Sequence, residues 1–258
     1  MYPRDRYLDT VQAGAVLFRT APMIPKTIHQ CRLSNFDEPP TALTPEERRL
    51  CRRMRQVMPD WEYRFWIDAA VDAMIQEVFP QYLKIFRTIR RGVVKADIAR
   101  YMYLFACGGF YFDTDYKLLR RIDDGMLSYS CVLPLSRSTE TSFRLGNAVM
   151  GSEPGHPFWS DFIAHIFSTA GLTNLAESKV EEITGPDGLT AFFLSRRHLY
   201  PNMYLPDRPI FHPIHTLRGF LSRTEPRTIG IHLSWGSWRT TNPFAAMLRL
   251  TRRKITSF

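Results

Sequence analysis

Residues 95–119, "KADIARYMYLFACGGFYFDTDYKLL", decide the expected fold. Apolar residues recur at three- and four-residue intervals from 94 to 105, which predicts a helix with one apolar face. The glycines at 108 and 109 are typical of a helix stop, and "FYF" at 110–112 predicts a brief strand. Asp113 and Asp115 therefore follow directly at the carboxyl end of a strand.

Strands and helices alternate along the rest of the chain. Thr44-Pro45-Glu46-Glu47 resembles a helix start with Thr44 as the N-cap. The patterns predict strands at 23–33, 61–68, 131–135 and 146–152, with a last strand and loop over 229–238. They predict helices at 45–58, 156–170 and 189–198, one or two helices over 68–86 interrupted near Pro80, and a turn at 184–188. Such alternation indicates a layered α/β arrangement. We expect one domain over residues 23–240, with a leader at 1–22 and a tail at 241–258.

The chain is basic, with 34 Lys and Arg against 25 Asp and Glu and a net charge of +9. Basic clusters attract phosphate groups of many kinds. Between 243 and 258, apolar and basic residues interleave in a pattern compatible with a helix on an anionic membrane surface. A nucleic-acid binder would alternate basic and exposed aromatic residues. Because the aromatic runs here are typical of buried strands, no nucleic-acid partner is expected.

The four cysteines lie without CxxC pairs, which is typical of reduced thiols in a reducing compartment. No apolar run approaches the roughly 20 residues of a membrane-spanning helix. The first residues lack the basic-then-apolar order of a signal peptide. We therefore expect a cytoplasmic protein that makes peripheral contact with the inner face of a membrane through its tail.

Asp113 and Asp115 need an explanation in a basic chain. Side chains at i and i+2 of a straight strand point to opposite faces, so these two share an ion only if the strand ends or bends between them. Mg²⁺ or Mn²⁺ prefers oxygen ligands and keeps positions for water and phosphate oxygens. An ion held here would bridge the protein to an anionic substrate. The alternative is a pair of aspartates that only caps a turn.

Asp97 and Arg100 lie three residues apart on the preceding helix and share one face. In a functional interpretation, Asp97 accepts hydroxyl protons from a sugar while Arg100 contacts hydroxyl or phosphate oxygens. The alternative is an exposed ion pair.

These motifs, in this order, resemble the DxD-containing sugar transferases of glycosyltransferase family 32, which are related to initiating mannosyltransferases, capsular polysaccharide transferases and the catalytic domains of glucosylating toxins. "IPKTIHQ" at 24–30 resembles the opening strand of that family, "MPDWEYRFWID" at 58–68 its second strand region, and "IHLSWGSW" at 231–238 its closing motif. The resemblance implies a GT-A nucleotide-diphospho-sugar transferase fold, a single three-layer α/β/α domain with a mixed central sheet.

The resemblance also implies residue roles. Asp97 and Arg100 would hold the donor sugar. Asp113 would contact ribose and metal, Asp115 would be the principal metal ligand, and His232 would be the third. The alternative for His232 is a core histidine with its hydrogen bonds satisfied. Further candidates for binding the nucleotide sugar or its surroundings are Ile28, His29, Arg32, Trp66, Asn147, Gly185, Pro186, Ser237 and Trp238.

One residue departs from the family pattern. The family usually places a tryptophan two residues after "IPKTIHQ", where it helps to stack the nucleobase, whereas this chain has Arg32. A guanidinium plane can also stack on a base. The pocket would then survive with an altered nucleotide preference, and the base is left open between a UDP- and a GDP-sugar donor.

The expected function is a metal-dependent retaining glycosyltransferase that transfers a hexose to a saccharide acceptor in capsular or cell-envelope polysaccharide synthesis. A toxin-like effector that glycosylates a host protein is an alternative within the same fold. A DxD phosphatase, in which the first aspartate is the nucleophile, is a remote alternative because its motif usually ends the first strand. A non-catalytic basic module that binds nucleic acid or an anionic membrane is a third.

Overall fold

The computed structural model describes residues 23–40, 42–213, 215–216 and 221–235. Its centre is a six-stranded sheet in the order β2-β1-β3-β8-β5-β9. β1 pairs in parallel with β2 and β3, whereas β8 runs antiparallel to both β3 and β5, so the sheet is mixed. The strands are β1 (Thr27–Cys31), β2 (Glu62–Trp66), β3 (Gly109–Phe112), β5 (Cys131–Val132), β8 (Val149–Ser152) and β9 (Met203–Tyr204).

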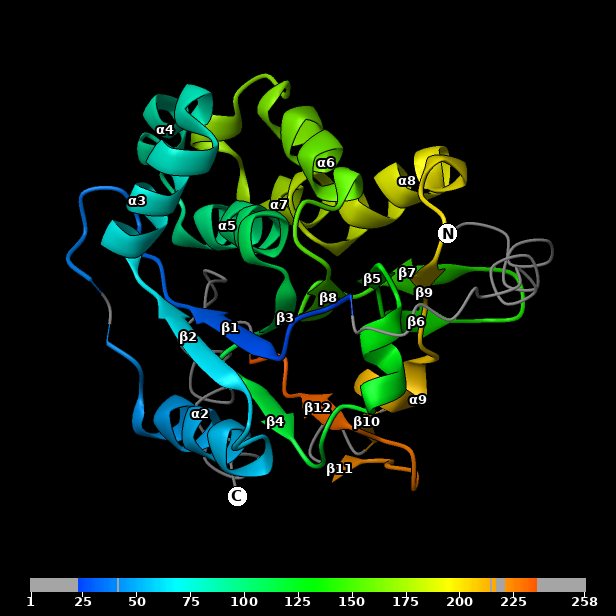
Figure 1. Cartoon of the computed structure of the whole chain (residues 1–258). Coiled ribbons are helices and arrows are strands. Elements are labelled where there is room, and N and C mark those ends of the chain that lie inside the picture. Colours follow the sequence, from blue (N-terminus) through cyan, green and yellow to red (C-terminus); the bar gives the residue numbers. More distant parts are fainter. Residues whose placement is uncertain (1–22, 41, 214, 217–220, 236–258) are drawn as a thin grey trace.

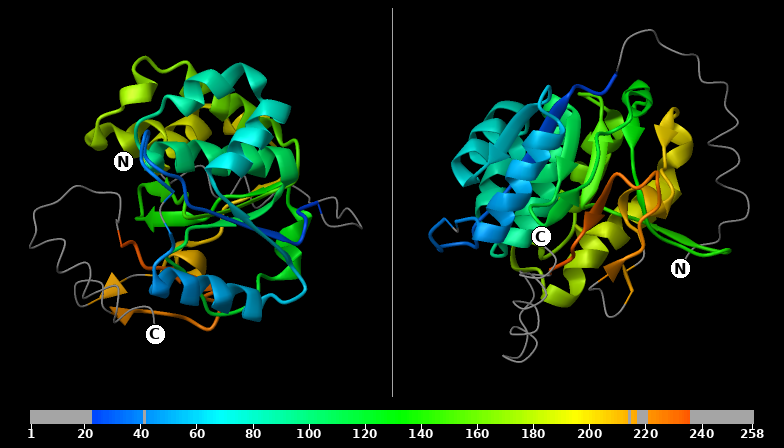
Figure 2. Two further views of the ribbon diagram at one scale, coloured as in Figure 1. Left: turned by 90° about the vertical axis from the view of Figure 1, so that its left-hand side faces the viewer. Right: turned by 90° about the horizontal axis from the view of Figure 1, so that it is seen from below.

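Helices cover both faces of this sheet (Figure 1), and the same three layers are visible from a second direction (Figure 2, left). One face carries α3 (Asp68–Val78), α4 (Pro80–Arg87), α5 (Gly92–Cys107), α6 (Pro157–Phe167), α7 (Glu177–Ile183) and α8 (Pro186–Arg196). The other carries α2 (Pro45–Val57) and the short α9 (Arg208–Phe211). The predicted α/β/α fold class is confirmed. The predicted leader and tail lie outside the described residues, and the domain limits remain predictions.

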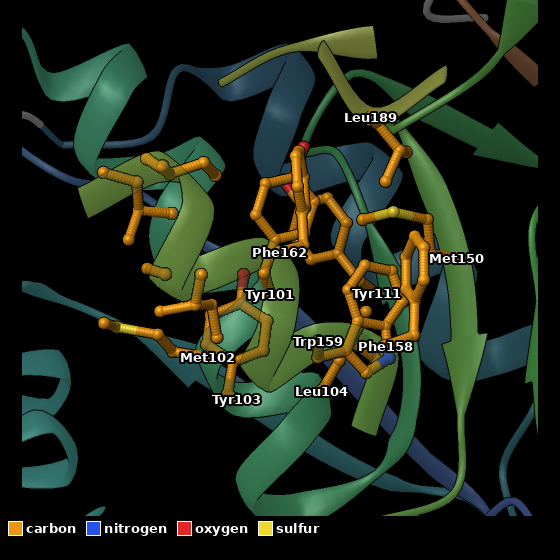
Figure 3. Close-up of a cluster of buried hydrophobic side chains, with 14 of the residues drawn as sticks. Tyr101, Met102, Tyr103, Leu104, Tyr111, Met150, Phe158, Trp159, Phe162 and Leu189 are labelled. Atoms are coloured by element: carbon orange, nitrogen blue, oxygen red, sulfur yellow. The ribbon is translucent and has the colours of Figure 1, made fainter. Parts of the chain in front are cut away.

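β3 is fixed by two hydrophobic cores, one on each face of the sheet. Tyr111 belongs to the core under α5 and α6, and Phe110 and Phe112 belong to the core on the α2 side, as the two-residue period of a strand requires. Figure 3 shows the first of these cores, in which Tyr101 and Trp159 stack with ring centroids 5.5 Å apart. The strand that precedes the two aspartates is therefore held rigidly from both sides.

α5 differs from its prediction, because it is buried on more than the one apolar face. Lys95, Asp97 and Arg100 are buried along with its apolar residues, since α3, α6 and three strands pack around it. Its end is as predicted: Gly108 adopts φ 65°, the left-handed conformation that favours glycine. No described helix combines the length and apolar composition required to cross a bilayer.

The predicted start of α2 is confirmed by a capping box. The Thr44 hydroxyl accepts a hydrogen bond from the Glu47 amide at 3.3 Å, and the Glu47 carboxylate accepts one from the Thr44 amide at 2.8 Å. Pro45 occupies the first helical turn, where its missing amide hydrogen costs nothing. The cap holds Glu47 in a buried position.

Three segments differ from the predicted structure. Pro134 divides the strand predicted at 131–135, and β6 (Leu135–Ser138) instead forms a separate hairpin with β7 (Phe143–Leu145). The last predicted strand is shorter: β12 (Gly230–His232) pairs outside the main sheet with β4 (Tyr116–Leu118). The turn predicted at 184–188 is already helical from Pro186, because proline is well suited to the first turn of α8.

His29, in the middle of β1, is a fully buried neutral imidazole. Its Nε2–H donates to the Gly108 carbonyl at 2.7 Å, and its Nδ1 accepts from the Trp66 indole N–H at 3.0 Å. Burial lowers the pKa of His29 from 6.5 to about 4. A proton on Nδ1 would also oppose the indole donor, so acid breaks this contact.

We expect His29 to make stability depend on pH between about 6.5 and 4. The unfolded chain binds a proton on this residue near pH 6.5 and the folded chain only near pH 4, so the folded state loses up to about 3 kcal/mol as pH falls through this range. His29→Gln should remove that part of the pH dependence, measured by urea unfolding at several pH values. Equal slopes for variant and wild type would contradict the expectation.

Candidate active site

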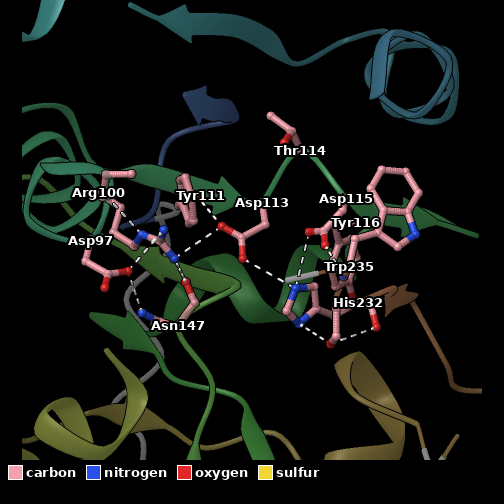
Figure 4. Close-up of polar contacts among 12 residues, drawn as sticks. Asp97, Arg100, Tyr111, Asp113, Thr114, Asp115, Tyr116, Asn147, His232 and Trp235 are labelled. Atoms are coloured by element: carbon pink, nitrogen blue, oxygen red, sulfur yellow. Dashed lines mark hydrogen bonds and ion pairs between the residues drawn. The ribbon is translucent and has the colours of Figure 1, made fainter. Parts of the chain in front are cut away.

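Asp113, Thr114 and Asp115 form the turn between β3 and β4. The Asp113 amide donates to the Ala148 carbonyl at 2.9 Å, and the Tyr116 amide donates to the Asp113 carbonyl at 3.1 Å. Because β3 ends before Asp113 and the backbone turns here, both carboxylates reach the same side of the turn (Figure 4). The bend that shared ligation requires is present.

His232 completes a cluster with the two acids. It ends β12, and the antiparallel register sets it opposite Tyr116, one residue after Asp115. Its Nε2 lies 3.2 Å from Asp115 Oδ1 and 3.5 Å from Asp113 Oδ2. One ligand atom from each of the three residues lies within 4.8 Å of the others. Asp115 Oδ2 also accepts the Trp235 amide hydrogen at 2.9 Å, which ties the segment after β12 to the turn.

The three groups shift one another's pKa values. Burial raises the pKa of Asp113. Burial also opposes ionisation of Asp115, but the adjacent His232 outweighs it and lowers the pKa of Asp115. Burial disfavours the imidazolium form of His232, yet Asp115 and Asp113 together raise its pKa. The cluster thus favours a cation between two carboxylates, and its two oxygen ligands and one imidazole nitrogen fit Mn²⁺ or Mg²⁺.

Asp97 and Arg100 are a buried pair, so the alternative of an exposed ion pair is wrong. Arg100 contacts Asp97 Oδ1 and Asp113 Oδ1, each at 3.2 Å, and the Arg100 and Asp97 side chains are 6% and 5% exposed. Asp97 also accepts hydrogen bonds from the Thr184 hydroxyl and the Asn147 amide, both at 3.0 Å. Burial raises the pKa of Asp97 to about 7, although Arg100 favours its ionised form.

A cavity of about 790 Å³ opens beside this network. Its volume lies in the range of small-molecule and cofactor sites. The predicted site residues that line it are Arg32, Asp97, Arg100, Asp113, Asp115, Asn147, Gly185, Pro186 and His232. Residues from α5, the β3–β4 turn, the N-terminus of α8 and β12, far apart in sequence, therefore meet around one hollow.

Comparison with known sequences identifies the family. Residues 44–133 match the glycosyltransferase sugar-binding region containing a DXD motif. This match over about a third of the chain bears out the resemblance to DXD-containing sugar transferases. It does not support the phosphatase and non-catalytic alternatives.

Two curated relatives of this chain are yeast proteins. Inositol phosphoceramide mannosyltransferase 2 of Schizosaccharomyces pombe is 30% identical over 74% of this chain and 51% of its own length. Mannosyl phosphorylinositol ceramide synthase CSH1 of Saccharomyces cerevisiae is 35% identical over 53% of this chain and 34% of its own length. The chain thus spans between about a third and a half of these relatives.

Among solved structures, the ligand-free glycosyltransferase domain of the YGT toxin resembles this chain in fold. The match has a TM-score of 0.54 at 10% identity and covers 91% of this chain and 87% of that one. It agrees with the predicted GT-A architecture.

Three predicted binding residues do not reach the cavity. Ile28 is 0% exposed and packs in the core on the α2 side. His29 and Trp66 bond to each other, and Trp66 stacks on Tyr103 at 5.2 Å. Ile28 and His29 are fully buried because β1 lies in the interior of the sheet. Trp66 ends the edge strand β2 and packs on His29 and Tyr103, so the structure does not bring these three residues into the candidate site. Ser237 and Trp238 lie outside the described residues.

Glu47 is a site residue that the sequence analysis assigned only to a helix start. Its carboxylate accepts hydrogen bonds from Arg32 at 2.8 Å and from the Thr114 hydroxyl at 3.1 Å. The ion pair places the Arg32 guanidinium at the cavity wall. The capping-box pattern was the available sequence signal, because it fixes Glu47 at the start of α2. It could not indicate that the same carboxylate also reaches the DxD turn.

Proposed function

We propose that the protein is a metal-dependent retaining glycosyltransferase that moves a hexose from a nucleoside diphosphate sugar to an acceptor hydroxyl. The observation that carries the proposal is the convergence of Asp113, Asp115 and His232 within 4.8 Å beside a cavity whose wall includes the buried Asp97–Arg100 pair. The match of residues 44–133 to the DXD-containing glycosyltransferases supports the sugar-transfer chemistry.

Each group has a role in this proposal. Asp115, Asp113 and His232 would hold Mn²⁺ or Mg²⁺, which, when bound, stabilises negative charge on a departing diphosphate. Asp97 accepts hydrogen bonds from donor-sugar hydroxyls, and Arg100 keeps Asp97 and Asp113 in place through its two ion pairs. The bond from the anomeric carbon to the phosphate oxygen breaks while the acceptor oxygen bonds to the same face, and the departing phosphate takes the acceptor proton.

The names of the yeast relatives favour mannose as the transferred hexose, and we propose a saccharide of the capsule or cell envelope as the acceptor. The test is a screen of GDP-mannose and several UDP-hexoses for Mn²⁺-dependent hydrolysis by the purified protein, with and without EDTA. We expect one donor to be hydrolysed only when the metal is present. Failure of every donor, with metal supplied, would refute the proposed function.

We also propose a cytoplasmic location with peripheral membrane contact through residues 241–258, which rests on the basic and apolar composition of that segment. Cosedimentation with vesicles rich in phosphatidylserine should fall when the chain is ended at residue 240. Equal binding by the shortened chain would contradict this role.

A further inference from the structure

Arginines line the cavity at five positions, and they differ in whether a described carboxylate neutralises them. The neutralised ones and their partners are Arg32 with Glu47, Arg100 with Asp97 and Asp113, and Arg144 with Glu181 and Asp187. Arg137 and Arg208 also line the cavity, and neither forms an ion pair within the part of the chain that the structure describes. The wall that carries these two is therefore positively charged.

The two unneutralised arginines come from neighbouring elements. Arg137 lies on β6 and is exposed; the hairpin register sets it opposite Arg144. Arg208 begins α9, which packs against β6. Like charges on opposed strand positions are destabilising, and the two nearby carboxylates both bind Arg144. The charge on Arg137 therefore has no evident structural purpose.

Arg208 is held with its guanidinium beside the cavity. Its Nε donates to the His212 carbonyl at 3.1 Å, which fixes the group and leaves its terminal nitrogens to bind elsewhere. Partial burial and then the charge of Arg137 lower the pKa of Arg208, as expected for two cations on neighbouring elements. The His212 ring lies 6.1 Å from that of His232. The positive wall thus adjoins the metal-ligand cluster but is built on other elements.

The pair is suited to an anion other than the donor diphosphate. Guanidinium groups bind phosphate and carboxylate through paired N–H donors, and two of them side by side without carboxylates are stabilised by such a ligand. On the proposed function, the acceptor must enter the same cavity as the donor. We infer that Arg137 and Arg208 recognise an anionic group, phosphate or carboxylate, on the acceptor saccharide. This inference rests on the proposed function and names its acceptor class.

Binding of small probes tests the inference apart from turnover. With Mn²⁺, GDP and UDP present to occupy the donor site, calorimetry compares myo-inositol 1-phosphate and glucuronate with neutral myo-inositol. We expect at least one anionic probe to bind about tenfold more tightly than myo-inositol. The difference in affinity between the two anionic probes shows whether phosphate or carboxylate is preferred. Arg137→Gln and Arg208→Gln should each weaken that binding about fivefold or more. The charge-matched control Lys84→Gln, on the exposed face of α4, should not.

Two outcomes overturn the inference. In one, both arginine variants bind the anionic probes as tightly as Lys84→Gln does. In the other, the variants raise the KM of donor hydrolysis to the same extent as they weaken probe binding, which assigns the arginines to the donor diphosphate. If the wild type hydrolyses no donor when metal is supplied, the proposed function is refuted instead. Arg137 is exposed and forms no ion pair with another described residue, so its variant keeps the test valid if Arg208→Gln misfolds.

Discussion

Asp115→Asn is expected to lower the transferase turnover by about 10³-fold or more. Its carboxylate is the one group that contacts both His232 and the Trp235 amide. Asparagine preserves the size of the side chain but removes the charge that balances a divalent cation. Since a bound metal contributes several kcal/mol of stabilisation to a departing diphosphate, and each 1.4 kcal/mol or so is a factor of ten in rate, the loss should be large.

The readouts for Asp115→Asn are Mn²⁺ affinity by calorimetry and turnover at saturating metal and donor. We expect both to fall, and the thermal unfolding midpoint without metal to fall slightly as well, because the lowered pKa of Asp115 means that His232 stabilises its charge in the folded chain. The matched control is Asp60→Asn, whose carboxylate is half-exposed and pairs with Arg121 away from the cavity. Wild-type Mn²⁺ affinity in Asp115→Asn would show that the cluster is not the metal site.

Much of this site follows from local sequence. A glycine stop, a short strand of aromatic residues and two acids one residue apart are all contiguous features, and their conformations are set within a few residues. The placement of Asp113 and Asp115 on one side of a turn was therefore predictable. The Asp97–Arg100 spacing on one helix face was predictable for the same reason. Its burial was not, because it depends on α6 and α7 segments that pack from far along the chain.

The remaining features depend on pairing between distant segments. β12 joins β4 rather than the main sheet, and that register alone brings His232 to the acids. The hairpin of β6 and β7 forms because Pro134 interrupts the ladder, and it carries Arg137 to the cavity wall. Conversely, the family pattern around His29 predicted contact with the nucleotide, but His29 lies on an interior strand and its side chain is buried in the core. Local patterns do not specify such neighbours.

Arg100→Gln is expected to destabilise the folded chain by about 3–5 kcal/mol, because it removes the only cation that contacts both Asp97 and Asp113 among the described residues. The Arg100 side chain is 6% exposed, so water cannot replace it. Arg87→Gln is the matched control: Arg87 pairs with Asp72 on an exposed surface, where loss of an ion pair costs less than about 1 kcal/mol. Urea unfolding measures both.

A second substitution separates charge from shape in this network. Asp97→Asn in the Arg100→Gln background removes one of the two stranded negative charges, so we expect the double variant to regain part of the lost stability. It should not regain turnover, because the carboxylate that would accept sugar hydroxyls is gone. If the two residues do not interact, the stability losses of the single variants Arg100→Gln and Asp97→Asn should simply add in the double variant. Recovery of stability without activity, the expected result, would show that turnover needs the Asp97–Arg100 pair itself and not only the stability that the pair provides.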